Sequence, residues 1–236
     1  MPMMPSRDVP TTQEALLLHA SPQITGPRTT RSIMRNVLVA LAPSAVAAVL
    51  LFGWHALAEI CVSVAACVLF EHAWCRLRHI PSTTQDLSAA VTGVLLAFNV
   101  PSTLPLYMLV IGDFVAIILT KELFGGIGCN FANPAVVGRV FLAIAFPVAM
   151  TTFVAPGIAL SPVDVTSSAT PLAPGAPRLM LRELLLGTHM GVLGETSALA
   201  ILAGFAYLLV TRTVTWHIPV TYVGTVAILS LMAGYD

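Results

Sequence analysis

The chain has 236 residues, of which 57% are apolar and only 9% charged, and its mean hydropathy is +0.88. An ordinary soluble domain carries about 25% charged residues, so this composition argues against a soluble fold and indicates an all-α, polytopic helical membrane protein. Lys plus Arg and Asp plus Glu number 11 each, and this balance gives no basic surface for nucleic acid. The four cysteines form no CxxC pair, which argues against a cysteine-only metal site.

The N-terminal part is polar and contains scattered prolines. Its only apolar run, residues 15–18, is too short for the core of a cleavable signal. We therefore expect residues 1–35 to form a cytoplasmic N-terminal arm that stays on the chain. Residues 36–236 then form the transmembrane domain.

Apolar segments in that domain predict about seven transmembrane spans, each needing ~20 apolar residues in helix. The expected spans cover residues 36–53, 57–74, 87–100, 104–123, 134–154, 194–210 and 218–232. The third is short and ends at Pro101, so it is either tilted or broken. A loop at about 155–180 is too rich in proline and glycine for a helix, and an amphipathic stretch at 179–186 follows it.

Positive charges predict the orientation of these spans. Those that fall on one side if the N-terminus is cytoplasmic are Arg28, Arg31, Arg35, Arg76, Arg78, Lys121, Arg139 and Arg212. The opposite side receives only Arg178 and Arg182. The proline-rich loop is therefore expected to be extracytoplasmic.

That loop contains a run of hydroxyl side chains, Asp164-Val165-Thr166-Ser167-Ser168-Ala169-Thr170-Pro171-Leu172. Two interpretations are open. The run is either a solvated turn, since hydroxyls before a proline are common in turns, or a place where one hydroxyl is esterified to a phosphate.

A second polar run, Gly125-Gly126-Ile127-Gly128-Cys129-Asn130-Phe131-Ala132-Asn133-Pro134, precedes the fifth expected span. Its glycines permit irregular backbone, and Asn130 and Asn133 can cap the following helix. It is either a capped turn or the lining of an ion path.

Acidic residues in the spans are the remaining candidates. Asp113 lies near the middle of the fourth span, where it is either a buried, protonated or paired acid that holds helices together or part of a cation or proton path. Glu59 and Glu195 are either interface or helix-start carboxylates or part of such a path. Glu71, near the end of the second span, is expected to be a solvated interface group.

Four stretches of the chain together resemble one family of membrane proteins. They are the loop from Asp164 to Leu172, the glycine–asparagine run to Ala135, Gly191-Val192-Leu193-Gly194-Glu195-Thr196-Ser197, and Thr215-Trp216-His217-Ile218-Pro219-Val220. The first is similar to the family's flavinylation motif, Ser-Gly-Ala-Thr or Ser-Thr-Ala-Thr, and Ser168 stands where many members have glycine or threonine. The family is that of the D subunit of the Rnf ion-translocating electron-transport complex, related to the B subunit of the sodium-pumping NADH:quinone reductase.

The resemblance implies that Thr170 carries FMN through a phosphoester, attached by a separate flavin transferase, with Ser167 and Ser168 able to bond phosphate oxygens. It also implies a noncovalent riboflavin. The candidate residues for this second flavin site, or for an ion path, are Asn130, Asn133 and Asp113. The implied role is electron transfer between ferredoxin- and NAD-linked partner subunits with coupled Na⁺ or H⁺ transport, in the lipid of the bacterial inner membrane.

Two other function classes stay open, a transporter or permease without a redox role and a structural membrane anchor. A covalent flavin would separate the first class from both. Family members generally continue for further spans, so the end of this chain at Asp236 predicts a truncated or split version.

Overall fold

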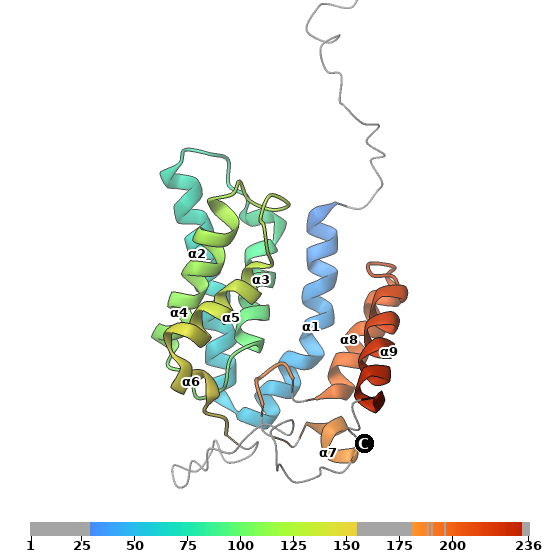
Figure 1. Ribbon diagram of the computed structural model, residues 1–236. Coiled ribbons are helices and arrows are strands. Elements are labelled where there is room, and N and C mark those ends of the chain that lie inside the picture. The colour runs from blue at the N-terminus through green and yellow to red at the C-terminus, as the bar shows by residue number, and fades with distance from the viewer. Residues whose placement is uncertain (1–28, 155–180, 188, 190, 196, 233–236) are drawn as a thin grey trace, which may run out of the picture.

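The computed structural model describes residues 29–154, 181–187, 189, 191–195 and 197–232, and over these residues the chain is helical without strands (Figure 1). The elements are α1 (Thr30–Phe52), α2 (Trp54–Leu77), η1 (Thr84–Asp86), α3 (Ser88–Phe98), α4 (Leu106–Phe114), η2 (Val115–Glu122), α5 (Pro134–Ala145), α6 (Pro147–Thr151), α7 (Leu181–Leu186), α8 (Ala198–Val210) and α9 (His217–Met232). The prediction of an all-α fold is therefore confirmed for the described residues.

Two of the described helices, α1 and α2, are long and apolar enough to cross a membrane. They contain 23 and 24 residues, which at 1.5 Å per residue is roughly 35 Å each. Gly53 separates them at a positive φ of 74°, which favours glycine. The apolar helices α3, α5, α8 and α9 are shorter than a full span, so the count of seven spans stays a prediction.

The start of α1 is earlier than the sequence pattern of apolar residues suggests. Thr29 is its N-cap, and its side-chain oxygen accepts a hydrogen bond from the Ser32 amide at 3.2 Å. The helix therefore takes in residues 30–35, which the apolar pattern leaves in the N-terminal arm.

Several of the expected spans are interrupted. α3 ends at Phe98, where the Asn99 side chain donates to the Leu95 carbonyl at 2.7 Å, just before Pro101. The expected fifth span is divided into α5 and α6 at Phe146, directly before Pro147. The fourth is continuous, but its second half, η2, is a π-helix. The third expected segment is thus a short helix of 11 residues, and the choice between a tilted span and a broken helix stays a prediction.

Close packing between helices depends on glycine. A Cβ at Gly93 of α3 would lie 2.8 Å from the Val64 Cα of α2, and one at Gly204 of α8 would lie 2.1 Å from the Ala40 carbonyl oxygen of α1. Such small residues let backbones approach in the way typical of membrane helices. α2 to α5 thus form one bundle, and α1 lies between this bundle and α8 (Figure 1).

Helix ends that carry positive charge lie together. The start of α1, the end of α2 and the turn between α8 and α9 are at the same end of the molecule, at the top of Figure 1. These ends bear Arg31, Arg76, Arg78 and Arg212. The arrangement agrees with the common side that the charge pattern predicts.

Candidate functional site

The expected flavin attachment site cannot be placed. Thr170, Ser167 and Ser168, with the whole loop 155–180, lie outside the described residues. The candidate site that the structure describes is a set of buried polar side chains inside the helix bundle.

A polar stripe runs along the buried face of α2. It consists of Glu59, Ser63, Cys67, Glu71 and Cys75. Residues four apart lie on one face of a helix, and the first four of these side chains are fully buried while the fifth is 2% exposed. Glu59 and Glu71 are about 18 Å apart along the axis at 1.5 Å per residue, so the stripe extends through much of the bundle.

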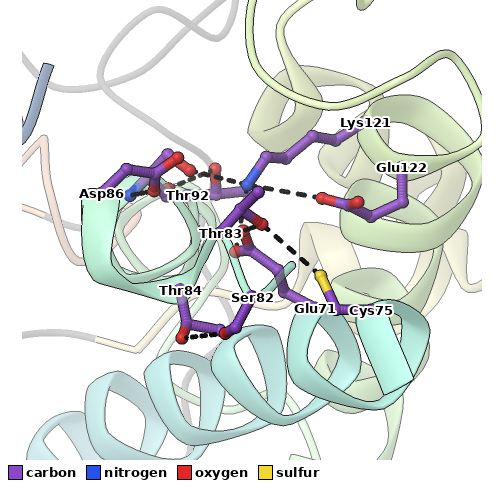
Figure 2. A network of polar contacts seen from close by, with 10 residues as sticks. Glu71, Cys75, Ser82, Thr83, Thr84, Asp86, Thr92, Lys121 and Glu122 are labelled. Atoms are coloured by element: carbon purple, nitrogen blue, oxygen red, sulfur yellow. Dashed lines mark hydrogen bonds and ion pairs between the residues drawn. The ribbon is translucent and has the colours of Figure 1, made fainter. Parts of the chain in front are cut away.

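At one end of the stripe, Lys121 is the central cation (Figure 2). Its Nζ lies 3.0 Å from Glu71 Oε2 and 3.5 Å from Glu122 Oε1, and it donates a 2.6 Å hydrogen bond to Ser88 Oγ. Thr83 donates to the other oxygen of Glu71. Glu71 is therefore no solvated interface group, because a buried lysine neutralises it.

At the middle of the stripe, Asp113 of α4 meets α2. Its Oδ1 lies 2.6 Å from Ser63 Oγ and 3.2 Å from Cys67 Sγ. Asp113 has no exposed surface, and its Oδ2 makes no hydrogen bond to a described residue. The structure therefore shows Asp113 as a buried acid, and its part in a cation or proton path stays a prediction.

At the other end, Glu59 is fully buried, and its partner among the described residues is His55, whose Nδ1 lies 3.3 Å from Oε1. His55 is 49% exposed, so it connects the buried carboxyl to the surface. Glu59 is thus not an exposed interface carboxylate, whereas Glu195 is exposed.

The two candidate asparagines lie together in the loop before α5. Asn133 is the N-cap of α5 and accepts from the Ala135 amide at 3.0 Å, while Asn130 donates to the Ala132 carbonyl at 2.7 Å. Both line a cavity of about 150 Å³ whose other polar walls are Ser88, Thr92 and Lys121. The structure thus brings Asn130, Asn133 and Lys121 together, and Asp113 does not line this cavity.

That cavity is smaller than the ~300 Å³ at the lower end of ordinary ligand pockets. A flavin ring would need the loop to move outward. Gly126 and Gly128 in this loop are at positive φ, and no atom lies within 4 Å of a Cβ placed on them. The residues present therefore fit a flavin only after a local opening.

A larger cavity of about 510 Å³ lies between α1, α3, α5 and α8. Its polar walls include Asn99, Arg139 and Glu195. Arg139 Nη1 donates to Asn99 Oδ1 at 3.0 Å, at the point where α3 breaks. Arg139 lies within α5, and its charged group contacts the end of α3.

Sequence inspection missed Lys121 and Glu71 as site residues. One signal for the stripe is visible in the sequence, because polar residues recur at every fourth position of an otherwise apolar helix from Glu59 to Glu71. The pairing of Glu71 with Lys121 has no such local signal, since the partners are on different helices.

Comparison with known proteins agrees with this architecture. The model of the NQR2, RnfD, RnfE family matches residues 17–236. The chain is 41% identical to the D subunit of the Na(+)-translocating ferredoxin:NAD(+) oxidoreductase complex of Acetobacterium woodii, covering 94% of this chain and 70% of the relative. It is 37% identical to the D subunit of the proton-translocating ferredoxin:NAD(+) oxidoreductase complex of Clostridium ljungdahlii, covering 92% and 69%.

A third relative is the D subunit of the ion-translocating oxidoreductase complex of Alcanivorax borkumensis, which is 35% identical over 93% of this chain and 71% of its own length. The family match spans every helix of the structure, from α1 to α9. The chain therefore belongs to the NQR2, RnfD, RnfE family.

Proposed function

We propose that this chain is a membrane subunit of an ion-translocating ferredoxin:NAD⁺ oxidoreductase complex and passes electrons within it. The observation that carries the proposal is the similarity over 92–94% of the chain to D subunits of complexes that are named for this activity. The chain has no glycine-rich dinucleotide fingerprint and no cysteine set for an iron–sulfur cluster. Ferredoxin and NAD therefore bind to partner subunits.

The electron carrier in the proposal is FMN, held by a phosphoester on Thr170 and attached by a flavin transferase. Its support is the run Ser167-Ser168-Ala169-Thr170-Pro171-Leu172. A covalent link keeps the cofactor from being lost outside the cytoplasm. The bound flavin supplies the redox chemistry, and the protein supplies position and electrostatics.

The loop around Asn130 and Asn133 is the proposed place of a noncovalent riboflavin. In support, amide groups and the Lys121 cation can bond the polar edge of a flavin ring, and both asparagines and Lys121 line one cavity. Because that cavity is small, binding would displace the loop from Gly125 to Asn133.

The proposed topology has about seven spans in the bacterial inner membrane, with a cytoplasmic N-terminus. The gathering of arginine-bearing helix ends at one end of the molecule supports it (Figure 1). Large apolar side chains on α8 and α9 are exposed, including Leu202, Val210, Ile218 and Leu229. They would contact lipid or the other subunits of the complex.

Ion movement is the second part of the proposal, and the polar stripe of α2 is its structural support. Carboxyl groups inside membrane helices are costly and generally functional. A transporter without a redox role would use the same stripe and the same broken helices. Loss of electron transfer when the Thr170 hydroxyl is removed would distinguish a redox subunit from a transporter without a redox role.

The test is ferredoxin-dependent reduction of NAD⁺ by membranes that contain the whole complex. Thr170→Val should abolish the activity while the complex still assembles. Thr166→Val is the matched control, because it removes a hydroxyl from the same loop and should retain activity. Full activity in the Thr170→Val complex would overturn the redox role, and retained ion transport would then favour a transporter.

A further inference from the structure

Three oxygen atoms, one each from α2, α3 and α4, lie within hydrogen-bond distance of one another through Ser63. Ser63 Oγ is 2.9 Å from the Gly93 carbonyl oxygen and 2.6 Å from Asp113 Oδ1. The glycine makes this possible, since a Cβ at Gly93 would lie 2.9 Å from the Ser63 carbonyl oxygen and push the helices apart. Both distances are those of direct hydrogen bonds.

The number of hydrogens in this chain of oxygens determines the state of the acid. Two hydrogen bonds need two hydrogens, and the Ser63 hydroxyl carries only one. The Gly93 carbonyl can only accept. If Asp113 were ionised, it too could only accept, and one of the two short contacts would lack a hydrogen. A hydrogen on Asp113 would give each of the two contacts a hydrogen of its own.

The surroundings of Asp113 favour the same state. The side chain is fully buried, and in the described part of the chain no lysine, arginine or histidine forms an ion pair with it. Lys121 is engaged by Glu71, Glu122 and Ser88. An unpaired carboxylate in such a site is strongly disfavoured.

The other titratable side chains on the packed elements do not supply the missing charge. Cys67 of α2 contacts Asp113 Oδ1 at 3.2 Å as a weak donor. α3 has no titratable side chain, and Arg139 of α5 donates to Asn99. A thiol and a hydroxyl are thus the partners that the structure gives Asp113.

We propose that Asp113 is a proton-binding site, with the neutral carboxyl donating to Ser63 and Ser63 donating to the Gly93 carbonyl. When the proton leaves Asp113, the Ser63 hydroxyl turns its hydrogen from Gly93 to the new carboxylate, so no second proton is needed. The 2.6 Å contact leaves no space for a cation between the two oxygens. That this proton takes part in coupled translocation rests on the proposed function, whereas its presence on Asp113 does not.

Infrared spectroscopy of the purified complex tests the proposal. The difference spectrum between wild type and Asp113→Asn should contain the C=O stretching band of a protonated carboxyl, and the band should shift to lower frequency in D₂O. Ser63→Ala removes the acceptor and should shift the same band, so the test does not rest on one variant. Thr120→Val is the control, because Thr120 is buried on the continuation of the same helix and, among the described residues, donates to the Val115 carbonyl and not to Asp113, so the band should be unchanged.

Absence of a protonated carboxyl band from both difference spectra would overturn the proposal. A band that disappears when NaCl replaces KCl at constant pH would show that the site takes Na⁺, which would also overturn it. The measurement is independent of the flavin. A complex with the Asp113 band but no flavin on Thr170 would contradict the proposed function alone.

Discussion

Replacement of Lys121, the only lysine in the chain, should strongly destabilise the protein. Its side chain is 3% exposed and lies between Glu71 and Glu122, whose side chains are 0% and 4% exposed. Lys121→Met would leave two buried carboxylates without a cation and remove the hydrogen bond to Ser88. Breaking a buried pair in this way costs about 3–5 kcal/mol.

The same geometry predicts a coupling between the two partners. In a Glu71→Gln background Lys121 faces one buried carboxylate fewer. Lys121→Met should therefore lower the free energy of unfolding by about 1–3 kcal/mol less than it does in wild type. The measurement is the denaturation midpoint of this subunit within the purified complex in detergent. Arg31→Met is the control, because Arg31 is exposed in the first turn of α1, and the change should be within about 0.5 kcal/mol.

Two results would refute this reasoning. If Lys121→Met were as stable as wild type, the buried ion cluster would not stabilise the fold. If its effect were the same with and without Glu71→Gln, Lys121 would act through some other contact.

The packing, the orientation and the acid in α4 give three further predictions. Gly93→Ala places a Cβ 2.8 Å from the Val64 Cα and should lower stability by about 1–3 kcal/mol. Gly224→Ala is the control, because its Cβ would meet no atom within 4 Å, and equal denaturation midpoints for the two variants would contradict the close approach of α2 and α3. In a background without the native cysteines, a cysteine at position 175 (Gly175→Cys) should react with an impermeant thiol reagent added outside, and labelling only by a permeant reagent would invert the topology. Asp113→Asn should impair coupled ion transport in proteoliposomes while flavin remains attached, and normal pumping would exclude a transport role for this acid.

The positions of the long helices could be predicted from the sequence because they follow from local apolar composition. The break at Gly53 and the helix start at Pro134 after the Asn133 cap are likewise local features. Thr29 is a residue type that commonly caps a helix, but the apolar pattern alone predicts a later start for α1.

The state of the buried polar groups could not be predicted, because it depends on helices that are distant in sequence. Glu71 is near a helix end and by position belongs at the interface, yet Lys121, fifty residues later, holds it inside. Arg139 serves only as a positive charge in the orientation prediction, yet it donates from α5 to Asn99 at the end of α3. Neither contact has a periodicity or motif that a single sequence displays.

The most direct measurement of the central claim is in-gel flavin fluorescence of the denatured subunit from cells that contain the flavin transferase. The account predicts a fluorescent band for wild type and Thr166→Val and none for Thr170→Val, at equal protein amounts. A fluorescent band of unchanged intensity in Thr170→Val, or no band in wild type, would contradict it.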